Sequence, residues 1–158
     1  KSNIEIKILY EKLITDVILP YLNINEALVQ QFPSIRFHLP NNIAIAKKHT
    51  DNSLGHPIGE INFTYSFTDM YDSNTLLVEK MPRLEEYEKI VMKSNNICSF
   101  NGNLCNHYNI LNKTNNTRIS MDFRVLPLNY FKNDNINCSI STNKKFINGD
   151  YYKLFSII

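Results

Sequence analysis

Three features that many chains have are missing from this sequence: a long apolar run, a cluster of basic residues and a closely spaced pair of cysteines. Without an apolar stretch of about eighteen residues no membrane span is expected, and no signal peptide is visible. Lysine and arginine are scattered and the net charge is only +2, so no nucleic-acid partner is expected. The three cysteines lack CxxC spacing, which indicates reduced thiols in a cytoplasmic protein.

The length of 158 residues is that of one domain with a single core. Residues 1–33 are expected to form a helical N-terminal part. Within it, apolar residues at mostly four-residue spacing predict a helix over Asn3–Leu19 that ends at Pro20, and a shorter helix is predicted over Asn25–Gln31. Residues 34–158 are expected to form the β-structured body on which these helices pack.

Short alternating runs separated by turn residues fill the rest of the chain and predict seven to nine strands. The clearest of these runs lie at 35–39, 43–51, 60–67, 75–79, 97–100, 118–126 and 151–158. Residues 82–92 are expected to form a short helix or a surface insertion. Many short strands are typical of an antiparallel sandwich or barrel. The predicted fold class is therefore mainly β, a double-stranded β-helix of the jelly-roll or cupin-like type with N-terminal helices.

Two of the predicted strands have an unusual polar face. One of these faces holds two of the four arginines in the chain, and its residues are Arg118, Ser120, Asp122 and Arg124. The other carries Glu60, Asn62, Thr64 and Ser66. Alternate residues of a strand share a face, so both sets are expected to line the inside of an open barrel that binds a charged ligand. Asp122 and Arg124 are expected to form structural ion pairs there, whereas Tyr65, on the apolar side, is expected to pack in the core.

His49 and Asp51 are two residues apart and share one face of a predicted strand, about 7 Å apart at the backbone, which two ligands of one metal can span. A second histidine from a distant strand would complete two histidines and a carboxylate with open coordination positions, the set typical of non-haem Fe(II) oxygenases. His107 is the natural candidate, and no thiolate pair favours structural zinc. His56 is a rival ligand for which a loop role is expected, and His38 is expected to be a packed or surface residue.

An Fe(II) enzyme that uses 2-oxoglutarate also needs a cation for the far carboxylate of that cosubstrate. Arg118 offers a guanidinium that binds a carboxylate in a fork, and Ser120 adds a hydroxyl on the same face. Asn62 and Asn74 are expected to point inward as further cofactor-binding residues, although a plain turn role explains Asn74 equally well. Arg36 is expected either to line the pocket or to be exposed.

The order His49-x-Asp51, His107 and Arg118-x-Ser120 resembles the motif set of the Fe(II)/2-oxoglutarate-dependent dioxygenases, and roughly residues 35–155 are similar to the StrG-like proteins of streptomycin biosynthesis. The segments that carry this resemblance are HTDNSLGHPIGEINF at 49–63, NTLLVE at 74–79, FNGNLCNHYNILN at 100–112 and TRISMDFRVLP at 117–127.

The resemblance implies a double-stranded β-helix in which His49, Asp51 and His107 bind Fe(II), while Arg118 and Ser120 hold 2-oxoglutarate. It also implies that molecular oxygen and 2-oxoglutarate are consumed, that succinate is formed and that a small molecule is oxidised, as by a hydroxylase. That small molecule is expected to belong to secondary metabolism or to sugar biosynthesis.

Two other functions use the same polar lumen. A cupin-type isomerase or epimerase would need no 2-oxoglutarate and no oxygen. A jelly roll that binds a carboxylate or a sugar without turnover would need no metal, so metal analysis separates it from the other two.

Overall fold

A computed structural model describes residues 4–44, 47–132, 137–140 and 142–157. The chain begins with three helical segments in direct succession: α1 over Ile4–Leu13, the π-helical η1 over Ile14–Ile18 and α2 over Leu19–Leu22. The predicted stop at Pro20 is therefore wrong. Pro20 lies in the first turn of α2, where a missing backbone N–H is tolerated, and the helix ends instead at Asn23 in the left-handed conformation.

The second predicted helix, over Asn25–Gln31, is also wrong, because Glu26–Gln30 forms the strand β1. Apolar clusters cover both faces of this strand, so its apolar residues are buried on both sides. Ala27 and Val29 face the core beneath the helices, whereas Leu28 belongs to a second apolar cluster. A short apolar run buried on both sides has no clear periodicity, and helix and strand then look alike in sequence.

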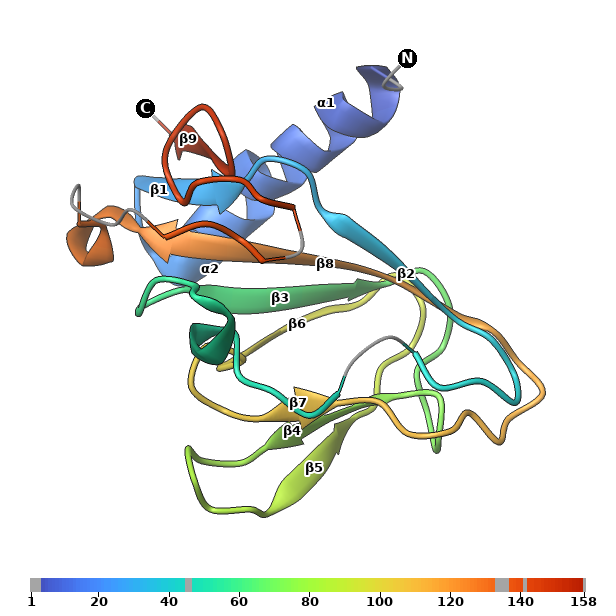
Figure 1. Cartoon of the computed structure of the whole chain (residues 1–158). Coiled ribbons are helices and arrows are strands. Elements are labelled where there is room, and N and C mark those ends of the chain that lie inside the picture. The colour runs from blue at the N-terminus through green and yellow to red at the C-terminus, as the bar shows by residue number, and fades with distance from the viewer. Residues whose placement is uncertain (1–3, 45–46, 133–136, 141, 158) are drawn as a thin grey trace.

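Two antiparallel sheets make up the body of the molecule (Figure 1). In the larger sheet the order is β6-β3-β8-β1-β9, and β2 also pairs with β8. Its strands are β1, β2 (Ser34–His38), β3 (Ile61–Ser66), β6 (Ile97–Phe100), β8 (Arg118–Pro127) and β9 (Tyr152–Ser156). The smaller sheet has the order β5-β4-β7 and consists of β4 (Leu76–Glu79), β5 (Tyr87–Ile90) and β7 (His107–Tyr108).

The two faces of the larger sheet have different partners. The helices pack against one face and bury an apolar core that includes Ile14 of η1, Phe63 of β3 and Phe123 of β8. On the other face β3 and β8 pair so that Asn62 is opposite Arg124. The predicted alternation in β3 and β8 is confirmed, because their apolar side chains meet the helices and their polar side chains turn to the interior between the sheets.

Most predicted strands are present, and with the two packed sheets they confirm the mainly β, cupin-like fold class. Residues 43–51 are an exception. No described residue there belongs to a strand, and His49 only bridges to His107 through two backbone hydrogen bonds; residues 45–46 lie outside the described part. In the 82–92 region the expected helix is replaced by β5. Short 3-10 turns lie at Asn52–Leu54 (η2) and Leu128–Tyr130 (η3).

The described residues include no helix with both the length and the apolar character needed to cross a bilayer. The same residues contain no disulfide among the three cysteines.

Candidate metal centre

His49, Asp51 and His107 come together at one edge of the interior between the sheets. His107 begins β7, His49 is held beside it by the backbone bridge, and Asp51 leads into η2. Nε2 of each histidine lies 3.8 Å from Oδ1 of Asp51, and the two rings are 4.5 Å apart between centroids. One ligand atom from each residue falls within 4.8 Å of the others, a spacing that one ion can bridge.

Both imidazoles are oriented by the backbone of their own segment. Nδ1 of His49 lies 2.7 Å from the carbonyl oxygen of Lys47, and Nδ1 of His107 lies 3.2 Å from that of Cys105. A carbonyl can only accept, so each Nδ1 carries the hydrogen and each Nε2 keeps its lone pair toward Asp51. Burial lowers the pKa of His107, partly opposed by the charge of Asp51, which favours the neutral ring that a metal requires.

The carboxylate of Asp51 is buried and held from its far side. Arg124 of β8 donates from Nε to Oδ2 at 2.6 Å and from Nη2 to Oδ1 at 2.9 Å, and Asn62 of β3 donates to Oδ2 at 2.5 Å. Burial by itself raises the pKa of Asp51, but the charge and hydrogen bonds of Arg124 outweigh burial and hold that pKa well below its usual value. Asp51 is therefore ionised, and Oδ1 faces the two imidazoles.

Gly102, in the turn after β6, closes around this carboxylate. Its carbonyl accepts the backbone N–H of Asp51 at 2.9 Å. A Cβ at Gly102 would lie 2.8 Å from Cγ of Asn62 and 2.7 Å from a ring carbon of Phe100, closer than side chains approach. The glycine therefore allows Asn62 to reach Asp51.

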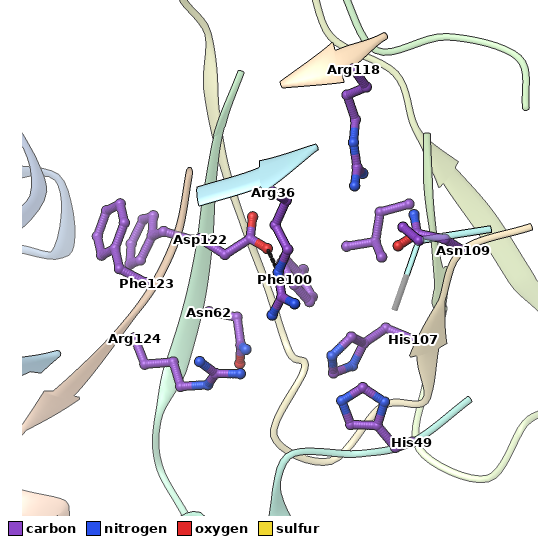
Figure 2. A pocket seen from close by; sticks show the side chains of 13 residues that line it. Arg36, His49, Asn62, Phe100, His107, Asn109, Arg118, Asp122, Phe123 and Arg124 are labelled. Carbon is purple, nitrogen blue, oxygen red and sulfur yellow. Dashed lines mark hydrogen bonds and ion pairs between the residues drawn. The ribbon is translucent and has the colours of Figure 1, made fainter. Parts of the chain in front are cut away.

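A small interior cavity of about 50 Å³ adjoins the centre. Figure 2 shows His49 and His107 on one side of this cavity and Arg118 entering it from the end away from them. Phe100 and Leu76 supply apolar parts of the wall. The cavity therefore has a candidate metal end and a cationic end.

Two polar atoms on this face of β8 have no partner among the described residues: one is on Arg118 at the cationic end, and the other is on Ser120, which is not among the residues that line the cavity. Arg118 is 3% exposed and Ser120 is 1% exposed, and among the described residues neither Nε of Arg118 nor Oγ of Ser120 has a hydrogen-bond partner. Burial lowers the pKa of Arg118, against the opposing charge of Asp122. Buried donors are nearly always paired in folded proteins, so these two atoms indicate a missing acceptor.

The remaining candidates from the sequence have other surroundings. The side chain of Asn74 binds the backbone N–H of Tyr71 and the carbonyl of Asp69, so its hydrogen bonds favour the turn role, and it is not among the residues that line the cavity. His38 is buried between two backbone carbonyls. Arg36 lines the cavity and donates from Nε to Asp122 at 2.9 Å. Tyr65 packs against the core as expected.

His56 does not join the candidate centre but forms its own buried contact. Its Nδ1 lies 2.8 Å from Oε2 of Glu60, whose other oxygen accepts from Tyr152. Asp51, His56 and Glu60 also have ligand atoms within 4.8 Å of one another. Both oxygens of Glu60 are already hydrogen-bonded, so the set with His49 and His107 is the more open of the two.

The sequence predicts an ion pair for Arg124 but does not identify the acid. In the structure that acid is Asp51, one of the three candidate metal ligands. The available signal was the shared face of β8, which places Arg124 in line with Arg118, three alternations away.

No family model matches the chain. The streptomycin biosynthesis protein StrG of Streptomyces griseus is 34% identical over 124 residues, which are 78% of this chain. The chain spans 58% of the length of that relative.

Two solved structures share the fold. The nickel complex of the non-heme monooxygenase ThoJ has a TM-score of 0.58 at 16% identity and covers 72% of this chain and 49% of its own. AviO1 from Streptomyces viridochromogenes Tue57 has a TM-score of 0.56 at 11% identity, with coverage of 78% and 61%.

Proposed function

From the likeness to StrG and the geometry of the centre, we propose that the chain is part of a biosynthetic enzyme of the non-haem oxygenase type that acts on a small molecule. More specifically, we propose that it is an Fe(II)- and 2-oxoglutarate-dependent oxygenase of the hydroxylase kind, with molecular oxygen as cosubstrate. The observation that carries the proposal is the convergence of Nε2 of His49 and Nε2 of His107 on Oδ1 of Asp51, at 3.8 Å each.

The donor set fits a divalent iron. Two neutral imidazole nitrogens and one carboxylate oxygen suit Fe(II), and three protein ligands leave positions for other groups. Each histidine is aimed by a backbone carbonyl and Asp51 by Arg124, so the ligands keep their directions without an ion. Such second-layer contacts fix the ligand tautomer and support metal affinity.

The cationic end of the cavity fits the far carboxylate of 2-oxoglutarate. A guanidinium and a hydroxyl from the same face of β8 would receive that carboxylate, and it would pair the two buried atoms that have no partner among the described residues. Asn62 is proposed as a further cofactor contact, since its Oδ1 is also buried without a described partner.

With both groups bound, iron and 2-oxoglutarate would supply the chemistry for oxidising an unactivated carbon at the expense of molecular oxygen. The protein supplies position and shelter. Arg118 orients the cosubstrate along the cavity, Phe100 and Leu76 restrict water, and Arg124 keeps the Asp51 carboxylate ionised and directed at the imidazoles.

An anaerobic titration tests this proposal. Protein with Fe(II) and 2-oxoglutarate is expected to develop a weak visible charge-transfer band, which His107→Ala and Asp51→Ala abolish and which Arg118→Gln shifts to higher 2-oxoglutarate concentration. His56→Ala is the matched control and keeps the band, because His56 contacts Glu60 and not the two imidazoles. Absence of the band, together with no succinate from any substrate tried in air, would contradict the proposal.

A further inference from the structure

A second, outer cleft shares part of its wall with the inner cavity. It has a volume of about 340 Å³, and Arg36, His49 and Arg124 line both spaces. Figure 2 shows Arg36 extending between Asp122 and the two histidines. Since His49 lines both spaces, a molecule in the outer cleft would lie beside a candidate metal ligand.

The wall of the outer cleft is cationic and carries no acid. Its charged side chains are Arg36, Lys47 and Arg124, and no aspartate or glutamate is among its described lining residues. Arg124 is already committed to Asp51. Lys47 forms no ion pair with any acid in the described part of the chain, and Arg36 uses only Nε for Asp122, so its two terminal nitrogens donate to no described residue.

Neutral hydrogen-bonding groups surround these cations. Gln30, Ser34 and Thr142 line the same cleft. Two cations with unused donors bind a phosphate or a carboxylate, and the amide and hydroxyl groups suit a polar body attached to that anion. Leu54 and the ring of Tyr151 supply apolar surface beside these polar groups, so the cleft suits a molecule that carries both an anionic group and a carbon framework.

We propose that the outer cleft is the substrate site and that it selects a polar small molecule carrying a phosphate or carboxylate group, which Arg36 and Lys47 hold. The term substrate rests on the proposed oxygenase function, whereas anion binding by these two residues does not. His49 at the shared wall then brings the polar body of the bound molecule next to the metal centre.

Nuclear magnetic resonance titration of metal-free protein tests the anion site separately from the oxygenase function. The probes are inorganic phosphate, acetate and, as a neutral arm, methyl glucoside. Phosphate or acetate is expected to shift the backbone signals around Arg36 and Lys47 in a saturable way, and the tighter of the two identifies the anionic group. Neither iron nor 2-oxoglutarate is present, so a failed charge-transfer experiment and a failed anion titration remain distinguishable.

Substitutions assign the site. Arg36→Gln and Lys47→Gln are each expected to weaken the tighter anion about tenfold, the effect of one charged hydrogen bond. Lys80→Gln removes an exposed lysine elsewhere and is expected to change nothing. Arg36→Lys keeps the charge and guards against a folding defect, with part of the affinity retained. Three results would overturn the proposal. They are binding of methyl glucoside alone, no saturable shift with either anion, and shifts that are removed only by Arg118→Gln.

Discussion

Arg124 and Asp51 form a buried ion pair with a direct role in the candidate centre. Asp51 is fully buried, and a carboxylate in that place is ionised only because the guanidinium binds both of its oxygens. Oδ2 accepts from both Arg124 and Asn62, whereas Oδ1 accepts only from Nη2 of Arg124 and retains a lone pair on the side of the imidazoles. Asp51 and Arg124 are 73 residues apart in the chain, so only the fold brings them together.

Replacement of Arg124 by Gln is expected to lower the free energy of unfolding by about 3 to 5 kcal/mol at neutral pH, because a buried carboxylate loses its partner. In the wild type the pKa of Asp51 is lower in the folded than in the unfolded chain, so its ionised form stabilises the fold above its ordinary pKa of 3.8 and this contribution is lost as the pH falls. The difference between variant and wild type should therefore shrink at about pH 3.

Urea unfolding followed by circular dichroism measures the free energy of unfolding of variant and wild type at neutral pH and at about pH 3. The matched control is Arg36→Gln, which breaks a more exposed arginine–aspartate pair and should cost no more than about 1 kcal/mol. Equal costs for the two arginines would contradict the special role of Arg124.

A methyl group at Gly102 offers a test that removes no ligand. The added Cβ would push Asn62 away from Asp51, so Gly102→Ala is expected to weaken Ni(II) or Co(II) binding roughly tenfold, as loss of a second-layer contact does. Gly149→Ala is the control, because a Cβ added there would meet nothing within 4 Å. The positive φ of Gly149 strains any substitution, so this control is used for metal affinity and not for stability. Isothermal calorimetry measures the affinities, and unchanged binding by Gly102→Ala would contradict this account of the turn.

At the level of elements, most strands were predictable, whereas β1, β5 and the segment around His49 were not. β3 and β8 each have one face on the helices and one on the cavity, so polar and apolar residues alternate. β1 is buried on both faces, so its sequence shows no alternation. Residues 43–51 are predicted to form a strand, but the described residues there are tied to β7 by only two backbone hydrogen bonds at His49. β5 is exposed and rich in charge, and its pairing with β4 outweighs its composition.

The helical segment stabilises the fold only through the side that packs on the larger sheet. Ile14 of η1 is fully buried in the core, whereas Ile8 of α1 is 48% exposed. Ile14→Ala is expected to cost about 2 to 5 kcal/mol in unfolding free energy and Ile8→Ala about 0.5 kcal/mol or less. Metal affinity should be unchanged in both, since the core under the helices lies on the other face of the sheet from the cavity. Similar costs for the two alanine variants in urea unfolding would contradict this packing.

At the level of the whole molecule, the candidate centre joins the two sheets. His107 belongs to the smaller sheet, whereas Asp51 is tied to Arg124 and Asn62 of the larger one. Sequence could propose the three ligands because each residue type is chemically distinctive. It could not show what holds them, because the supporting contacts come from both sheets and depend on their packing.

Metal binding is therefore expected to stabilise the molecule as a whole. Ni(II) at a hundred times its dissociation constant should add about 2.7 kcal/mol and raise the melting temperature by roughly 5 to 10 °C. Hydrogen exchange should slow in β4 and β7 as well as in β8. His49→Ala should abolish both effects, while His56→Ala retains them. Protection confined to one sheet would show that the ion does not connect the two.

The imidazole tethers have a consequence for protein engineering. Each histidine donates Nδ1–H to the carbonyl two positions earlier in its own segment, so the aim of the ring is encoded within three consecutive residues. Such a tripeptide is transplantable: placed in facing segments of an unrelated β scaffold, two copies would present their Nε2 atoms without help from a surrounding network. The carboxylate is not transplantable in this way, since its orientation is borrowed from an arginine on a distant strand.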